Sequence, residues 1–471
     1  MKHSVSKLFT FHSSLFTSEA LCTLLFGVAV LLFFGLAYPH HLHYQEQYQL
    51  FLFDSTYACE IVKLPGGIAD LLGRFCTQFF LYAWVGALII ALLLSAVQLL
   101  TLRLINVQRS MFNVQCSTFN VLSFVPSFLL WLFMLDENAL LGGVWAVLLT
   151  LFVILGCLML PKGWVRRIAI LIAIPILYWV AIGGSHYHRY PTVIPYLLYG
   201  SWLSAVLVPF LVRFCKFQVS GFRFQCIAFL LLSAVMGSLV WKNANFKAEK
   251  VMQYDFMARY QQWNRILETV NAEKPNNQIG VTVQNLALAM HGQLAEHLFD
   301  YNQNGIAGLL PDVQSDATSP MPTAEAFYQL GMINVAQRTV FEAQEAILDF
   351  QKSGRCYQRL AQTNLINGNY EVARKYLTAL QKTLFYRDWA NETLSLLGNE
   401  EAIAKHPEYG RLRQWAYNDD FYFSDHVTPE MLESLFFGNT DNHLAYQYLV
   451  AYYVLTNDRE RYTKLLLKIE H

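Results

Sequence analysis

Seven apolar stretches in the first half of the chain restrict its fold more than any other feature of the sequence. A helix needs roughly 20 apolar residues to cross the hydrocarbon of a bilayer. Stretches of about this length lie at residues 20–38, 79–100, 121–135, 140–160, 168–182, 193–211 and 226–241. We therefore expect an all-α protein whose residues 1–241 form a seven-span helical bundle. The third, fifth and seventh stretches are short. If one of them does not cross the membrane, every later segment lies on the opposite side of the membrane from the one predicted.

Charged residues make up only 14% of the chain, and in its first half they segregate between alternate loops. One side carries ten basic residues, Lys2, Lys7, Arg103, Arg109, Lys162, Arg166, Arg167, Arg213, Lys216 and Arg223, and the other carries Lys63, Arg74 and Arg189. Because basic loops are retained in the cytoplasm, we expect a multi-pass protein of the inner (plasma) membrane with a cytoplasmic N-terminus. Residues 242–471 would then be extracytoplasmic, in the periplasm if the source is a Gram-negative bacterium.

Two exclusions follow from the placement of charge. The whole chain has 34 basic and 34 acidic residues, so its balance gives no reason to expect a nucleic-acid partner. The seven apolar stretches contain no Asp, Glu, Lys, Arg or His. Ion-coupled transporters normally carry such groups inside their spans, so we expect no proton-coupled pump, and we look for chemistry in the outward loops.

The second half of the chain has the pattern of paired helices. Its clearest unit runs from Tyr357 to Gln381, with Gly368 between the two helices and Ala361 and Ala373 where they would cross. The spacing resembles a tetratricopeptide (TPR) repeat, with weaker copies at residues 254–275, 327–350 and 446–469. A stack of plain helical hairpins is the alternative. Stacked repeats share one continuous core, so we expect a soluble helical solenoid over residues 242–471 with a groove for a protein or peptide.

The first outward loop, residues 39–78, is unlike a solvated linker. It carries three histidines, His40, His41 and His43, and four acids, of which Glu46 and Asp54 come first. After Pro65, apolar residues recur at helical spacing and Asp70 pairs with Arg74 at i,i+4, so we expect a helix along the membrane surface. Other outward loops supply Asp136, Glu137, His186, His188 and Arg189. These side chains could meet at the outer rim.

This architecture resembles the core of the GT-C glycosyltransferases, membrane enzymes that use polyprenyl-phosphate-linked sugars. The resemblance covers about residues 19–241 and rests on the span number, the acidic first loop and the helix before the second span. With a repeat array on the outer side, the chain is also similar in outline to the TPR-containing O-mannosyltransferases. As a whole it resembles an uncharacterised family of bacterial multi-pass membrane proteins with a C-terminal TPR-like domain.

The GT-C resemblance implies a site. Asp54 would be the acid of the first loop and Glu46 the second acid, acting as general base or as ligand of a divalent metal. Arg189 or Arg74 would bind the sugar phosphate, and His186 and His188 are weaker candidates for a metal. Many GT-C enzymes carry two adjacent or near-adjacent acids early in this loop, whereas Glu46 and Asp54 stand eight residues apart.

Each of these residues also has a structural interpretation. Asp54 can cap a helix over residues 57–62, Arg189 can anchor at the interface, and the histidines can be solvated among headgroups. Cys59 and Cys76 share the first outward loop and could form a disulfide. We therefore keep two functions open, an extracytoplasmic glycosyltransferase that acts on a membrane lipid-linked sugar and a non-enzymatic scaffold of the cell envelope that recruits proteins.

Overall fold

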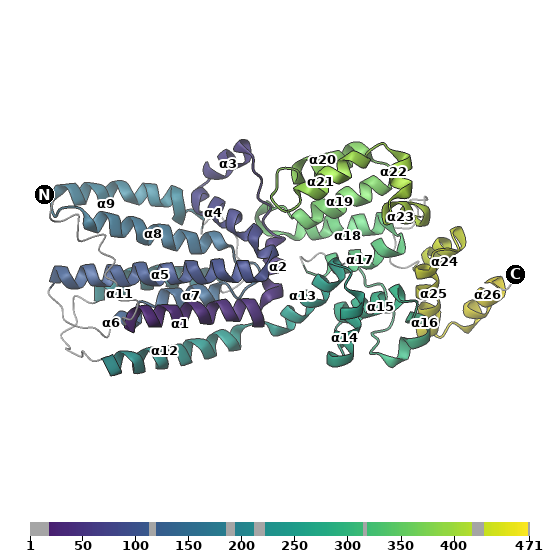
Figure 1. The fold of residues 1–471 in the computed structure, drawn as a ribbon, viewed down its shortest axis with the longest axis horizontal. Coiled ribbons are helices and arrows are strands. Elements are labelled where there is room, and N and C mark those ends of the chain that lie inside the picture. Colours follow the sequence, from purple (N-terminus) through teal and green to yellow (C-terminus); the bar gives the residue numbers. More distant parts are fainter. Residues whose placement is uncertain are drawn as a thin grey trace. The chain divides into compact units, whose positions relative to one another are not determined.

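The computed structural model describes residues 18–112, 119–184, 194–211, 222–313, 318–416 and 428–469. Within these ranges the chain forms helices and turns, with an isolated bridge between Asn304 and Ile306 and no β-strand. The all-α prediction is confirmed. The chain divides into two compact units (Figure 1). Unit 1 comprises Met1–Leu42 with Cys59–Asn245, and unit 2 comprises His43–Ala58 with Phe246–His471.

Five helices of unit 1, among the described residues, are long and apolar enough to cross a membrane. They are α1 (Ser18–Leu32) with the following turn to Ala37, α5 (Ala83–Phe112), α8 (Leu141–Met159), α9 (Trp164–Leu177) with the following turn to Ile182, and α12 (Phe222–Asn243). The third and sixth predicted stretches form the shorter apolar helices α6 (Phe119–Leu122) with α7 (Val125–Phe133), and α11 (Ile194–Leu211). The fifth and seventh stretches, which look short in the sequence, are of span length. This is the helix content of a membrane protein.

Helix α5 forms the centre of unit 1 and packs against α1, α7, α8 and α11. Its membrane-length window is 56% buried, whereas that of α9 is 11% buried. One polar group inside the bundle bonds to the backbone of a neighbouring helix, since the Ser127 hydroxyl of α7 donates to the Leu94 carbonyl of α5 at 2.8 Å. Helix α9 therefore keeps most of its apolar surface outside the protein core, as a helix that faces lipid does.

The segment α6–α7 runs beside α1 along the whole of that helix. Contacts join Asn120 to Glu19, Phe124 and Phe128 to Phe26, Trp131 to Phe33, and the Leu135 carbonyl to the Tyr38 hydroxyl. The two segments therefore run in the same direction and begin and end at the same levels. Helix α12 ends at the same level as α1 and α7, because the Asn245 amide, just after α12, donates to the Tyr38 hydroxyl at 3.1 Å.

The loop after α1 contains the predicted helix before the second span, α4 (Gly67–Thr77). It packs against α8 with the two backbones in contact, since a Cβ at Gly73 would lie 2.4 Å from the Gly142 nitrogen. The turn before α4 is also bonded to the bundle, because the Gly66 amide donates to the Trp179 carbonyl at 2.8 Å. The helix is confirmed, and its close packing against α8 is an addition to the prediction.

Unit 2 is built from helices that pack against their neighbours in the chain. Their bounds are α13 (Phe246–Arg259), α14 (Trp263–Glu273), α15 (Gln278–Met290), α16 (Leu294–His297), α17 (Pro320–Leu330), α18 (Ile333–Ala346), α19 (Gly354–Ile366), α20 (Tyr370–Leu380), α21 (Arg387–Leu396), α22 (Glu400–Lys405), α23 (Tyr409–Trp415), α24 (Thr428–Gly438), α25 (His443–Thr456) and α26 (Arg459–Ile469). Gly331 and Gly368, with φ of +91° and +75°, make the turns of the hairpins α17–α18 and α19–α20. Ala373 is fully buried, as its place in the repeat pattern predicts.

Residues 43–58, which we call the strap, belong to unit 2 although they follow the first apolar helix. The strap contains the end of α2 (Pro39–Glu46), a non-helical stretch, and the start of α3 (Ser55–Val62). The sequence placed these residues within the outward loop of the membrane domain. Because the strap belongs to unit 2, the partners of Glu46 and Asp54 are side chains of unit 2.

Candidate functional site

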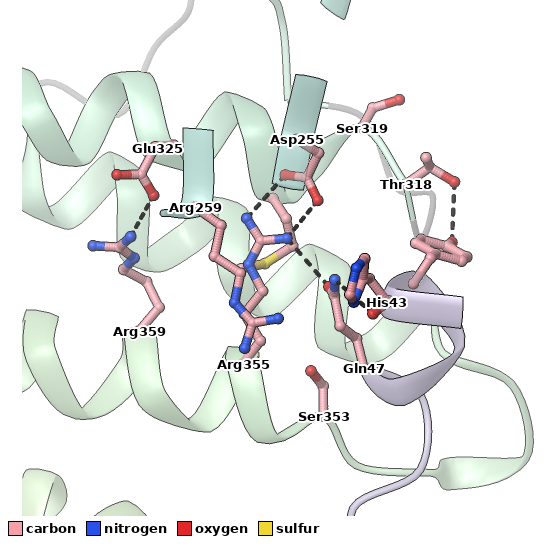
Figure 2. A network of polar contacts seen from close by, with 12 residues as sticks. His43, Gln47, Asp255, Arg259, Thr318, Ser319, Glu325, Ser353, Arg355 and Arg359 are labelled. Atoms are coloured by element: carbon pink, nitrogen blue, oxygen red, sulfur yellow. Dashed lines mark hydrogen bonds and ion pairs between the residues drawn. The ribbon is translucent and has the colours of Figure 1, made fainter. Parts of the chain in front are cut away.

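Three buried ion pairs lie together in unit 2 and form what we call the arginine cluster. Its members are Arg259 of α13, Arg355 and Arg359 of α19, Glu46 of the strap, Asp255 of α13 and Glu325 of α17. Figure 2 shows the three guanidinium groups with Asp255 and Glu325. Three positive charges meet three negative ones, which is the condition under which charges are tolerated in a protein interior.

Glu46 is buried, with 5% of the residue exposed. Its Oε1 accepts a 2.8 Å hydrogen bond from the Tyr386 hydroxyl, and its Oε2 lies 3.6 Å from Arg259 Nη1. Burial alone would lower the pKa of Arg259, but the Tyr386 and Glu46 oxygens raise it overall, so the guanidinium stays charged. Burial raises the pKa of Tyr386, which therefore stays a neutral donor. The strap is joined to α13 at this point.

Asp255 and Arg355 form a two-pronged pair, with Nη1 2.5 Å from Oδ2 and Nη2 2.9 Å from Oδ1. Arg355 Nη1 also donates to Gln47 Oε1 at 3.2 Å, a second polar contact between the strap and the helices (Figure 2). Two-pronged pairs combine charge attraction with fixed geometry. They hold α13, α19 and the strap in one arrangement.

Arg359 completes the cluster by pairing with Glu325 while its guanidinium lies 3.7 Å from the centre of the Tyr328 ring. The Tyr328 hydroxyl donates to Glu408 Oε1 at 2.9 Å, and burial raises the pKa of Tyr328 well above its ordinary value. The phenol therefore remains a donor. These contacts connect α17, α19 and the residue before α23.

Asp54 caps helix α3, as the structural interpretation of the sequence predicts. Its Oδ1 accepts from the amides of Thr56 and Tyr57 at 2.9 and 3.2 Å, and its Oδ2 is bound by Lys382 Nζ. The hydrogen bond from Lys382, and then that from the Tyr57 amide, lower the pKa of Asp54. Both acids of the predicted catalytic pair thus contact donors of unit 2. A general base has to reach a substrate proton, whereas this arrangement attaches the strap to the helices.

Arg74, a predicted phosphate ligand, lies in unit 1 and pairs with Asp70 on α4. Its Nε and Nη2 lie 3.0 and 2.8 Å from Asp70 Oδ2, and only 7% of Asp70 is exposed. Asp70 lines a small cavity whose other walls include Ala69, Gly142 and Trp202. A buried carboxylate beside a cavity with small apolar walls is a second place where a ligand could bind.

The structure describes only some of the remaining residues that the sequence singles out. Arg189, His186 and His188 lie outside the described residues. His41 is fully buried, not solvated, and its Nε2 lies 2.9 Å from the Met134 carbonyl oxygen. His43 stacks on Phe256 of α13. In the part of the chain that the structure describes, no three His, Cys, Asp or Glu side chains are grouped so as to hold a metal ion.

The cysteines of the first outward loop are unpaired. Cys59 and Cys76 are both free thiols, so the disulfide considered from the sequence is not formed. Cys22, Cys157 and Cys226, which lie in apolar helices, are free as well.

Sequence reasoning missed the partners of the acids in the strap. Arg259, Lys382 and Tyr386 carry no motif and lie more than 200 residues beyond the strap. No pattern in the sequence marks these partners. The one signal for the arginine cluster concerns its other members, since Arg355 and Arg359 stand one turn apart on a predicted helix, where a buried charge calls for a partner.

Comparison with known proteins identifies a family and no individual relative. A family model described as a family of unknown function (DUF6057) matches residues 13–186 and 181–470. No curated protein and no solved structure shows a significant match. The two matched ranges cover almost the whole chain and include both units. The chain therefore belongs to the DUF6057 family of unknown function.

Proposed function

We propose that this protein is a non-enzymatic scaffold of the cell envelope, in which unit 1 is a plasma-membrane anchor and unit 2 binds another protein. The observation that carries the proposal is the pairing of both acids of the strap with side chains of unit 2. Glu46 meets Arg259 and Tyr386, and Asp54 meets Lys382. The acids expected to be catalytic thus have a structural use, and stacked hairpins of TPR-like pattern suit protein binding.

The membrane topology that we favour has seven crossings, a cytoplasmic N-terminus and an extracytoplasmic unit 2. The strap and residues 246–471 form one unit, so an even number of crossings must separate them. Helices α5, α8, α9 and α12 supply four of these crossings, and α7 and α11 supply two more, which gives six. Because α6–α7 accompanies α1 from Glu19 to Tyr38, we count it as a crossing. The basic residues of alternate loops set the orientation.

A GT-C-like glycosyltransferase that uses a polyprenyl-phosphate-linked sugar is the second candidate. It is favoured by one feature, the buried Asp70–Arg74 pair beside the cavity of α4 and α8. An arginine suits a phosphate, and a carboxylate can act as a base. In this version the acid of the site is Asp70 of unit 1, and Glu46 and Asp54 keep their structural roles.

Complementation of a deletion strain separates the two functions. The scaffold predicts that Asp54→Asn complements at wild-type protein level, because Asn keeps the shape of the side chain and caps α3 as well as Asp does. It predicts that Asp70→Asn, which leaves buried Arg74 without its carboxylate, loses function only as far as its protein level falls. Deletion of residues 246–471 should abolish function. Loss of function in Asp70→Asn at normal protein level, with a changed glycan profile of envelope proteins or lipids, would replace the scaffold by the enzyme.

A further inference from the structure

We propose that strap residues Leu50–Asp54 are a built-in occupant of a peptide-binding surface on unit 2. When they leave it, this surface takes an extended segment of a partner protein with the pattern Leu-x-Leu-x-Asp. The inference rests on the scaffold function and names the class of its partner. The surface is formed by Lys352 before α19, by α19, α20 and the loop after α20, and by α21.

The main chain of Leu50–Asp54 is held as a bound peptide would be. The stretch is non-helical. The Leu50 amide donates to the Lys352 carbonyl at 2.9 Å, and the Phe53 amide donates to the Lys382 carbonyl at 2.6 Å. Any extended chain can supply such donors, so these two bonds give affinity without sequence preference.

Alternate side chains of the stretch supply the specificity. Leu50 is 8% exposed, and Leu52 packs beside it against an apolar group made by Ala361 of α19, Leu377 and Leu380 of α20, Tyr386, and Ala390 of α21. Asp54 pairs with Lys382. Phe53, which lies between Leu52 and Asp54 in the sequence, is 48% exposed. Leu50, Leu52 and Asp54 therefore contact the surface at positions i, i+2 and i+4, with a tight turn at Phe53, where the Asp54 amide donates to the Leu52 carbonyl at 2.9 Å.

The two halves of the strap are attached with different strength. In the first half, Tyr44, Glu46 and Tyr48 are buried against α13 and the arginine cluster. In the second half, Leu52 and Asp54 are half-buried, and the Asp54–Lys382 pair is of the surface type that contributes little to stability. Segments with few buried contacts open at low free-energy cost. The second half can therefore leave while the first half stays.

The intact protein should resist an external peptide. The strap is part of the same chain and is continued at both ends, so it competes at an effective concentration of order mM. Binding of a partner is then weak until the second half of the strap is displaced. The strap sets how readily this surface accepts a partner.

The test uses the full-length protein in detergent and a fluorescent synthetic peptide of residues 48–56 with a polar tail. We expect the variant Leu50→Ser/Leu52→Ser/Asp54→Asn to bind this peptide at least about 10-fold more tightly than the wild type. A control peptide with Ser at both leucine positions should bind neither protein. If the variant keeps its circular dichroism and melting temperature yet binds no more tightly than the wild type, the proposal is overturned.

Hydrogen exchange on the wild-type protein gives a second measurement that needs no altered strap. The amides of Leu50 and Phe53 should exchange by local opening, at least about 100-fold faster than the amides around Ala373 in α20. Equal rates would reject a releasable segment. Neither measurement involves an envelope partner. A failed complementation test would therefore reject the scaffold function without affecting the peptide-binding result.

Discussion

His41 makes unit 1 sensitive to acid through a single side chain. The ring is fully buried, its Nε2 lies 2.9 Å from the Met134 carbonyl oxygen, and its centre lies 4.6 Å from that of the Tyr38 ring. Burial lowers the pKa of His41 to about 3. The imidazole is therefore neutral in the folded protein at any pH at which a cell lives.

Stability of unit 1 should fall as the medium is acidified below the ordinary pKa of histidine. The unfolded chain binds the proton from about pH 6.5 downward, while folded His41 does not bind it until about pH 3. The contribution of neutral His41 to the free energy of unfolding is complete above about pH 6.5, and about 2 kcal/mol of it is lost by pH 5. Thermal unfolding in detergent at pH 7.5 and 5 measures this loss. His41→Gln should show less of it, and an equal acid response in both proteins would contradict the assignment.

Residues 54 and 46 show which side-chain roles a sequence can predict. The cap made by Asp54 is local, because the amides it binds lie two and three positions away, and the sequence anticipated it. Its ion pair with Lys382 joins residues 328 positions apart, and no periodicity or motif connects them. The sequence therefore singled out both acids and missed the partners that decide their use.

At the scale of elements, the contact between α4 and α8 depends on the absence of side chains. A Cβ at Gly73 would lie 2.4 Å from the Gly142 nitrogen, which is backbone and cannot move aside. Gly73→Ala should therefore separate the two helices and destabilise unit 1 by about 1–3 kcal/mol. Gly156→Ala on α8 is the matched control, since no atom lies within 4 Å of its added Cβ. Equal melting temperatures for the two variants would show that α4 is not packed in this way.

The positions of the helices could be predicted from the period of the apolar residues and from the turn residues. Which helices pack against each other could not. Helix α19 ends just before Gly368, which the repeat pattern placed between the two helices of its clearest unit. The hydropathy of residues 168–182 understated a helix that begins at Trp164, because Arg166 and Arg167 interrupt the apolar run. The strap was assigned to a loop since its attachment to unit 2 comes from contacts with helices 200 or more residues away.

For the whole molecule, membership of the strap in unit 2 predicts a result on membrane sidedness. In a cysteine-free background, Thr56→Cys in the strap and Phe299→Cys in unit 2 should both react with a membrane-impermeant maleimide in intact cells. Trp164→Cys, next to the basic residues at the start of α9, should react only after the cells are opened. All three positions are exposed. Different accessibility of Thr56→Cys and Phe299→Cys would be incompatible with one unit that contains both.

The central claim is that Glu46 joins the strap to unit 2 and performs no chemistry on a substrate, and a double variant tests it directly. Glu46→Gln leaves Arg259 without its carboxylate, and Arg259→Gln leaves Glu46 buried without its cation, so each should cost about 3–5 kcal/mol and lower the protein level. Combining them removes both charges and should restore melting temperature, protein level and complementation of the deletion strain together. A Glu46→Gln/Arg259→Gln protein that is folded, present at wild-type level and inactive would contradict the claim and return Glu46 to catalysis.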